Sequence, residues 1–183
     1  MLMQPEKAAL LVVDIQEKLV PAIHQGDQLA ARASWLIQAC QILNIPTLFT
    51  EQYPRGLGHT LPTLTSLVER PAVSTKVHFS AVAGGCLPRE WQNRSQIIVC
   101  GMETHVCVLQ TVLDLLQNGK NVFVVADVVG SRTEENRQLG LERMRNAGAQ
   151  IVSREMVVFE LMQQAGTDTF KTISKQFLVG DQP

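Results

Sequence analysis

The segment from Ile97 to Cys107 joins an apolar run to a helical pattern and places a cysteine close to the junction. Residues 97–100 are predicted to form a buried strand that ends at Gly101, where helical periodicity begins. The N-terminus of a helix carries unpaired backbone N–H groups and the positive end of the helix dipole, which favour a thiolate and can bind an oxyanion. The pattern therefore indicates Cys107 as a nucleophile. Because this helix is strongly apolar, a role for Cys107 as a small core residue stays open.

Apolar strand-like runs alternate with helical stretches along the 183 residues. Strands are predicted at 8–13, 46–50, 72–75, 96–100, 121–126 and 149–152. Helices are predicted at 28–43, 63–69, 88–93, 104–118, 155–164 and 169–177, and a capping box at Ser131 is predicted to open a further helix that ends at Ala147. Wholly apolar strands separated by helices imply a parallel sheet covered on both faces. We therefore expect an α/β fold with a single domain over residues 1–183: a three-layer doubly wound sheet of about six mainly parallel strands with helices on both faces.

Polar residues follow the predicted strands at the edge where such sheets bind ligands, beyond the carboxyl ends of the strands. Asp14 follows the first strand, Lys76 follows the third, and Cys107 lies beyond the fourth. A partly desolvated carboxylate can move a proton between a thiol and a leaving group, and an ammonium group lowers the pKa of a nearby thiol. Each residue also has a structural interpretation, because Asp favours turns and caps and most lysines are exposed.

Neither the histidines nor the glycines form a pattern typical of a metal or cofactor site. His105 lies two residues before Cys107, and residues at that spacing do not face each other on a helix. His105 is therefore expected to line a pocket at most. The sequence contains no HxxxH, HExxH or Gly-rich phosphate-binding motif, so we expect neither a metal nor a cofactor.

Charge and composition argue against several classes of partner. The net charge is −1 and Lys and Arg form no block, which argues against nucleic acid. The apolar runs are far shorter than the roughly 18 to 20 residues of a membrane-spanning helix, and the first residues lack the features of a signal peptide. The four cysteines form no CxxC pair, which favours reduced thiols. We therefore expect a cytoplasmic protein without a nucleic-acid or membrane partner, and small metabolites stay open as its ligands.

Three motifs together resemble the isochorismatase-like cysteine hydrolase superfamily: LVVDIQ at 11–16, KVHFSA at 76–81 and GMETHVCV at 101–108. The resemblance covers nearly the whole chain, in order. It implies a catalytic triad of Asp14, Lys76 and Cys107. It also implies a cis peptide bond between Met102 and Glu103, and an oxyanion hole formed by the backbone N–H groups of Glu103 and Cys107.

Two departures narrow the resemblance to one branch of the superfamily. Nicotinamidases carry an Asp-x-His…His metal site after the second strand, whereas residues 50–59 read TEQYPRGLGH. Isochorismatases lack the cysteine nucleophile that Cys107 provides here. The loop is most similar to that of the isochorismatase-domain-containing, YcaC-like branch, whose substrates are poorly defined.

The resulting hypothesis is a cofactor-free cysteine hydrolase that cleaves a small amide-like C–N bond through a thioester. The predicted substrate pocket contains Gln16, Gln52, Tyr53, His78, Phe79 and His105. Two alternatives stay open: a redox sensor based on Cys107, and a non-catalytic oligomeric protein with the same fold. The resemblance also implies a homo-oligomer, for which the apolar segment 156–162 is one candidate interface.

Overall fold

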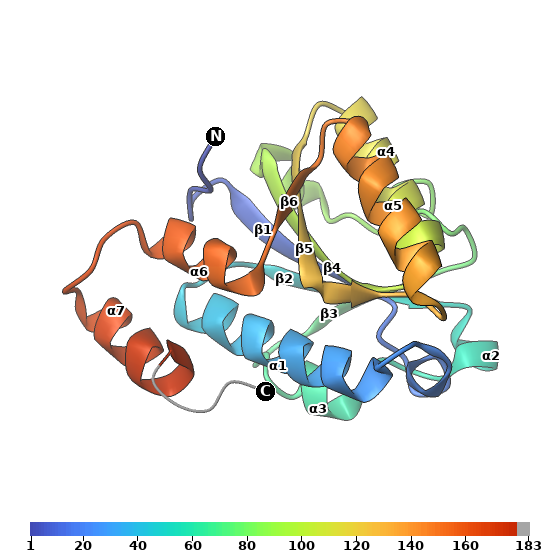
Figure 1. Cartoon of the computed structure of the whole chain (residues 1–183), viewed down its shortest axis with the longest axis horizontal. Helices are drawn as coiled ribbons and strands as arrows, with labels where there is room; N and C mark the ends of the chain where they lie inside the picture. Colours follow the sequence, from blue (N-terminus) through green and yellow to red (C-terminus); the bar gives the residue numbers. More distant parts are fainter. Residues whose placement is uncertain (179–183) are drawn as a thin grey trace.

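Six parallel strands form one sheet at the centre of the computed structural model, which describes residues 1–178 (Figure 1). The strands are β1 (Ala8–Val13), β2 (Thr47–Gln52), β3 (Ala72–Lys76), β4 (Gln96–Met102), β5 (Asn121–Gly130) and β6 (Gln150–Val152). Their order is β3-β2-β1-β4-β5-β6, and every neighbouring pair is parallel. The predicted α/β class and parallel sheet are confirmed. The predicted domain includes residues 179–183, which lie outside the described part.

Helices cover both faces of the sheet (Figure 1). The α-helices are α1 (Gly26–Ile42), α2 (Pro54–Leu57), α3 (Pro62–Thr65), α4 (Leu109–Gln117), α5 (Glu134–Asn146), α6 (Arg154–Met162) and α7 (Asp168–Ile173). Shorter turns are η1 (Val20–Ala22), η2 (Arg89–Asn93), η3 (Thr104–Val108) and η4 (Ser174–Leu178). Along β1, Leu10 and Val12 pack in one hydrophobic cluster with α1 and α6, whereas Leu11 and Val13 pack in a second cluster with α4 and α5. This alternation follows from the two-residue period of a strand, and it gives the three layers.

Three predicted boundaries differ from the structure in ways that affect the site. The fifth strand continues to Gly130, because Val129 and Gly130 pair with the end of β4 after a register shift. The predicted helix at 104–118 is divided into the π-helical turn η3 and the helix α4. The cap of α5 is Thr133, whose side chain accepts a hydrogen bond from Asn136 N, so the predicted Ser131 capping box is wrong.

The strand order reverses between β1 and β4. The chain leaves β1 toward α1 on one face, and it leaves β4 toward α4 on the other face, so the connections diverge and leave a crevice at the carboxyl ends of these strands. Asp14 directly follows β1, and the segment from Glu103 to Cys107 directly follows β4. Within residues 1–178, no helix is both long enough and apolar enough to cross a membrane.

Gly101 allows β4 to approach β1 closely at this crevice. Its φ of +135° lies in a region that residues with a Cβ atom rarely adopt. A Cβ placed on Gly101 would lie 2.0 Å from the Val13 carbonyl oxygen. Val13 is its register partner on β1, so the contact is between two backbones and neither can move without disturbing the ladder.

Gly101→Ala is expected to lower the free energy of unfolding by about 2 to 6 kcal/mol, because backbone strain and a steric overlap are added together. Urea unfolding followed by circular dichroism measures this change. Gly119→Ala is the matched control: Gly119 also has a positive φ, but a Cβ there would meet no atom within 4 Å. Equal effects of the two substitutions would contradict the importance of the β1–β4 contact.

Candidate functional site

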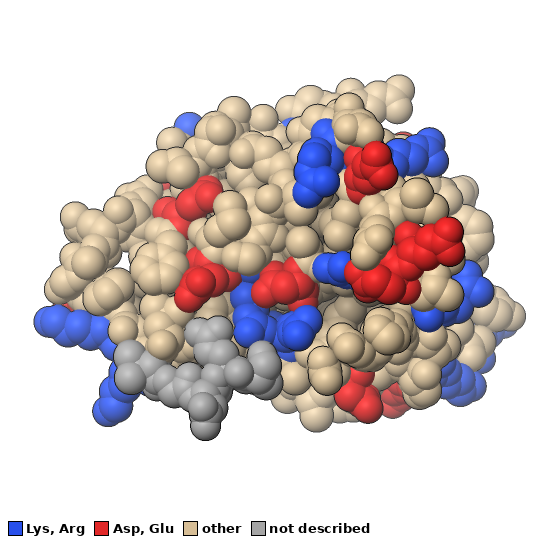
Figure 2. Space-filling model, in the orientation of Figure 1, with Lys and Arg blue, Asp and Glu red and all other residues tan. Residues whose placement is uncertain are grey.

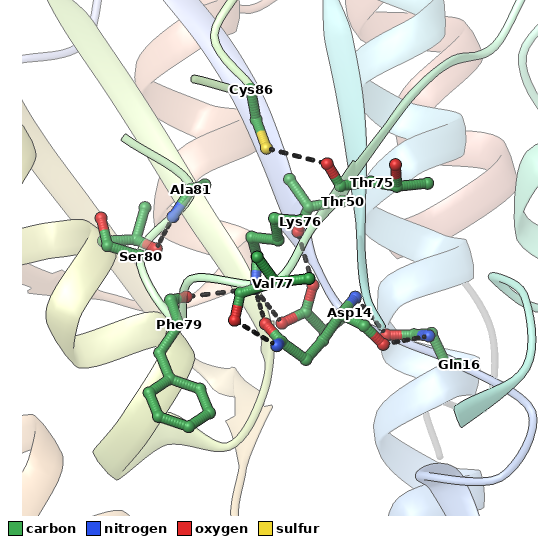
Figure 3. A network of polar contacts seen from close by, with 12 residues as sticks. Asp14, Gln16, Thr50, Thr75, Lys76, Val77, Phe79, Ser80, Ala81 and Cys86 are labelled. Atoms are coloured by element: carbon green, nitrogen blue, oxygen red, sulfur yellow. Dashed lines mark hydrogen bonds and ion pairs between the residues drawn. The ribbon is translucent and has the colours of Figure 1, made fainter. Parts of the chain in front are cut away.

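A buried ion pair links the ends of β1 and β3. Lys76 Nζ lies 2.7 Å from Asp14 Oδ2, and neither side chain is exposed to solvent (Figure 3). Lys76 is the last residue of β3, and Asp14 follows the last residue of β1 with a left-handed φ of 53°. Two residues that are 62 positions apart in the sequence are thus brought together by the parallel arrangement of their strands.

The strand between them, β2, supplies the remaining partners of this ion pair. Thr50 Oγ1 donates a hydrogen bond of 2.7 Å to Asp14 Oδ1, so both carboxylate oxygens are occupied. Lys76 Nζ also donates to Gln52 Oε1 at 2.8 Å and to the Phe79 carbonyl oxygen at 3.1 Å. These bonds satisfy the three donors of the ammonium group, which is the condition under which a buried charge is tolerated.

Cys107 lies in η3, is 4% exposed, and donates its thiol hydrogen bond to Asp14. Burial raises the pKa of this thiol to about 12, and the negative charges of Asp14 and Glu103 and the hydrogen bond to Asp14 also raise it, whereas Lys76 lowers it. The expectation of a thiolate favoured by a helix N-terminus is therefore wrong for the resting protein. At neutral pH the thiol is protonated, and its proton faces a carboxylate that can accept it.

A cleft of about 430 Å³ opens above Cys107. Its lining consists of Asp14, Leu19, Gln52, Leu57, Phe79, Glu103, Val106, Cys107 and Arg132. Apolar atoms form most of the exposed surface of this cleft, and the polar side chains in its lining are Asp14, Gln52, Glu103 and Arg132. The size and composition are typical of a site for a small molecule.

The backbone before Cys107 differs from the expectation taken from the family resemblance. All peptide bonds among residues 1–178 are trans, so the predicted cis bond between Met102 and Glu103 is wrong. The chain turns instead through Glu103, which has a left-handed conformation with φ 58° and ψ 61°. The Glu103 carbonyl oxygen accepts hydrogen bonds from the N–H groups of Val106 (2.9 Å) and Val108 (3.3 Å). The oxyanion hole at the N–H groups of Glu103 and Cys107 stays a prediction.

Five of the six predicted pocket residues fall in three different positions. Gln52 and Phe79 line the cleft. Tyr53 and His78 line a neighbouring hollow that also borders Lys76. Gln16 is fully buried and does not line the cleft, and its side chain bonds to the backbone of Gln52 and to the Gly58 carbonyl oxygen.

His105 contacts Ser131 and Glu103 and is not among the residues that line the cleft. Its Nδ1 lies 3.0 Å from Ser131 Oγ, and its Nε2 lies 3.7 Å from Glu103 Oε2. The structure thus gives His105 a place beside Glu103 rather than in the lining of the cleft. This agrees with the helical spacing argument, which separates His105 from Cys107.

Sequence reasoning missed Thr50, the side chain of Glu103, and Arg132. Thr50 ends the predicted second strand, so the strand-end rule that selects Asp14 and Lys76 applies to it as well. Arg132 comes shortly after the end of β5. Because the predicted fifth strand ends at Ala126, the strand-end rule does not select Arg132 from the sequence.

Within residues 1–178, no three His, Cys, Asp or Glu side chains gather as metal ligands. Glu51 and His59 form a pair, with His59 Nδ1 3.1 Å from Glu51 Oε2.

The other three cysteines are also buried free thiols. Burial raises the pKa of Cys40 to about 12 and raises that of Cys100 as well. Cys86 follows the loop after β3, and burial raises the pKa of its thiol despite the opposing effect of Lys76. Among the four, Cys107 is the one that lines the cleft with Asp14.

The chain is similar to known proteins over nearly its full length. The isochorismatase domain model matches residues 8–156. The mouse isochorismatase domain-containing protein 2A is 39% identical over 174 residues, which cover 93% of this chain and 82% of that protein. A Caenorhabditis elegans structure described as MAR1 ribonuclease is 38% identical, with a TM-score of 0.91, and the match covers 98% of this chain and 93% of that one.

Two structures of YcaC proteins are also similar. YcaC from Pseudomonas aeruginosa, solved with hexane-2,5-diol and covalent acrylamide, is 26% identical with a TM-score of 0.84 over 94% of this chain and 90% of that one. YcaC from Escherichia coli, described as an octameric hydrolase of unknown specificity, is 25% identical with a TM-score of 0.87 over 95% of this chain and 89% of that one.

Asp14→Asn is expected to accelerate the alkylation of Cys107 by iodoacetamide at pH 8. The substitution removes the charge and the acceptor that raise the pKa of this thiol and leaves Lys76, which lowers it. Each unit by which the pKa falls toward the ordinary value increases the thiolate fraction about tenfold. Intact-protein mass spectrometry over time measures the rate.

Lys76→Gln is expected to slow the alkylation of Cys107, because Lys76 lowers the pKa of the thiol. Asp27→Asn, a substitution at the exposed start of α1, is the control and is expected to leave the alkylation rate unchanged. Slower alkylation in Asp14→Asn than in the wild type would contradict the assignment of Asp14 as the group that holds the thiol proton.

Proposed function

This chain belongs to the isochorismatase family of hydrolases, and we propose that it cleaves a small amide-like C–N bond through a thioester on Cys107. One observation carries the proposal: a protonated thiol in an apolar cleft donates its hydrogen bond to a buried carboxylate that Lys76 holds in place. A nucleophile, a base and an orienting cation in mutual contact are the arrangement that covalent catalysis requires.

In the first half of the reaction, Asp14 takes the proton from the Cys107 thiol while Sγ attacks the amide carbonyl carbon. The carbonyl oxygen becomes an oxyanion, which the backbone N–H groups of Glu103 and Cys107 stabilise by hydrogen bonds. Asp14 then gives its proton to the leaving nitrogen as the C–N bond breaks. An amine or ammonia departs, and the acyl group stays on Cys107 as a thioester.

In the second half, Asp14 takes a proton from water as the water oxygen attacks the thioester carbon. The C–S bond breaks, the carboxylic acid is released, and the proton returns to the cysteine sulfur. Lys76 remains a cation throughout and stabilises Asp14 whenever the carboxylate is charged. Because the thiol pKa is raised, the proton transfer to Asp14 is a necessary part of the attack rather than a step completed beforehand.

The similar P. aeruginosa YcaC was solved with covalent acrylamide, a reagent that adds to nucleophiles through its carbon–carbon double bond. This supports a reactive nucleophile on the fold, whereas the cleavage of an amide bond rests on the geometry of Cys107 and Asp14 described above. The raised thiol pKa also counts against the redox-sensor alternative, because peroxide reacts with the thiolate form of cysteine. Localisation in the cytoplasm stays a prediction.

We also propose that the protein forms homo-oligomers, as the E. coli YcaC is described as octameric. The predicted interface segment 156–162 lies in α6, where Met156 and Phe159 are about half exposed although both are large and apolar. Exposed apolar side chains of this size are characteristic of the surfaces that proteins bury on association.

Cleavage of RNA, the activity in the description of the C. elegans structure, has less support from the charges of this chain. The net charge is −1. On the face of the molecule in Figure 2, basic and acidic side chains alternate, and no continuous basic area is present there. Binding of a phosphate backbone normally requires such an area.

Cys107→Ala is expected to reduce the hydrolysis of a small amide by more than about 10⁴-fold, because no other group in the cleft can form the thioester. Ammonia release from a panel of primary amides measures turnover, and mass spectrometry of the rapidly quenched wild-type protein detects the acyl adduct. Cys86→Ala is the matched control and is expected to retain most of the activity.

Amide hydrolysis that survives in Cys107→Ala would overturn the nucleophile assignment. A short RNA oligonucleotide is included in the panel. Its cleavage by both the wild type and Cys107→Ala, without turnover of any amide, would favour the ribonuclease function instead.

A further inference from the structure

Arg132 lines the cleft and uses only part of the hydrogen-bonding capacity of its guanidinium group within the protein. Its Nε donates a hydrogen bond of 3.0 Å to Glu103 Oε1, and the side chain is 59% exposed. The two terminal nitrogens, Nη1 and Nη2, make no hydrogen bond to any residue in the part of the chain that the structure describes. They are therefore available to a ligand in the cleft.

The Glu103 carboxylate, which lies next to Arg132, is less available to a ligand than the guanidinium group. The Glu103 side chain is 11% exposed, with Oε1 bound to Arg132 and Oε2 3.7 Å from His105 Nε2. Both oxygens are thus turned toward cationic or hydrogen-bonding partners within the protein. A ligand that enters the cleft meets the guanidinium group of this pair rather than the carboxylate.

Burial along the cleft defines its inner and outer ends. Asp14 and Cys107 are buried and form the inner end, where the proposed reaction takes place, whereas Phe79 and Arg132 are more than half exposed and form the outer end. Leu19, Leu57 and Val106 make the wall of the cleft apolar. The cleft therefore combines a reactive polar end, an apolar wall and a cationic rim.

We propose that the substrate is an amide that also carries a carboxylate, and that Arg132 binds this carboxylate through its two free nitrogens. The planar fork of a guanidinium group matches a carboxylate in a paired hydrogen-bonding geometry, which Lys reproduces poorly. The short aliphatic chain between the two groups of the substrate lies along the apolar wall. Arg132 is thus a specificity residue, and this inference rests on the proposed amide hydrolysis.

The test compares matched pairs of amides of similar length, one with a terminal carboxylate and one without: succinamate with butyramide, and glutaramate with pentanamide. In the wild type we expect kcat/KM to be at least about tenfold higher for the carboxylated member of a pair, the effect of one charge-assisted interaction. In Arg132→Gln we expect the ratio to fall to about one, and in Arg132→Lys to take an intermediate value. The ratio isolates substrate recognition, because any effect of Arg132→Gln on Glu103 or on the thiol acts on both members of a pair.

Arg145→Gln, which removes an exposed arginine from the last turn of α5, is the control for net charge and is expected to keep the wild-type ratio. Equal kcat/KM for the two members of each pair in the wild type would overturn the inference and leave the proposed amide hydrolysis intact.

A measurement that needs no turnover covers the case in which none of these amides is hydrolysed. Succinate is expected to slow the alkylation of Cys107 by iodoacetamide in the wild type, and to do so at about tenfold higher concentration in Arg132→Gln. Equal protection of the two proteins, or no protection of either, would overturn the inference. Protection of the wild type alone would support it even if amide hydrolysis itself proved wrong.

Discussion

The ion pair between Asp14 and Lys76 is the constraint on which the rest of the site depends. Two opposite charges with no solvent exposure are stable only if they are in contact and their remaining hydrogen-bonding groups are satisfied, and loss of one partner from such a pair typically costs about 3 to 5 kcal/mol. Here Thr50 and Gln52 complete the bonding from β2. The ends of three neighbouring strands must therefore stay in register, and that register determines where the inner end of the cleft lies.

The topology supplies the second half of the site. The strand order reverses between β1 and β4, so that the segment carrying Cys107 leaves the sheet beside Asp14 but on the opposite face from α1. Gly101 makes this approach possible, since a Cβ at that position would overlap the Val13 backbone. The proposed nucleophile and its proposed base thus follow two strands that are neighbours in space but are separated in the sequence by β2 and β3.

The charges in the cleft explain why a protonated thiol is compatible with the proposed catalysis. Burial and the adjacent carboxylates hold the pKa of Cys107 high, which protects the resting thiol from chance oxidation or alkylation. The same carboxylate that raises the pKa is the group placed to accept the proton. In the proposed mechanism the site is therefore inert until a substrate carbonyl is present to receive the sulfur, and the proposed role of Arg132 at the outer end is to select that substrate.

Local periodicity and turn chemistry are sufficient to predict the α/β fold and the approximate places of the six strands, three short motifs indicate the family, and the strand-end rule selects Asp14 and Lys76 from residue order alone. Properties that depend on residues far apart in the sequence could not be predicted from it. These are the strand order, the protonated state of Cys107, the trans bond before Glu103, and the positions of Gln16, His105 and Arg132 relative to the cleft. The physical reason is the distance along the chain over which the interacting residues are spread. Periodicity is a property of residues a few positions apart, whereas a pKa or a cleft wall depends on which strand ends the tertiary fold brings into contact.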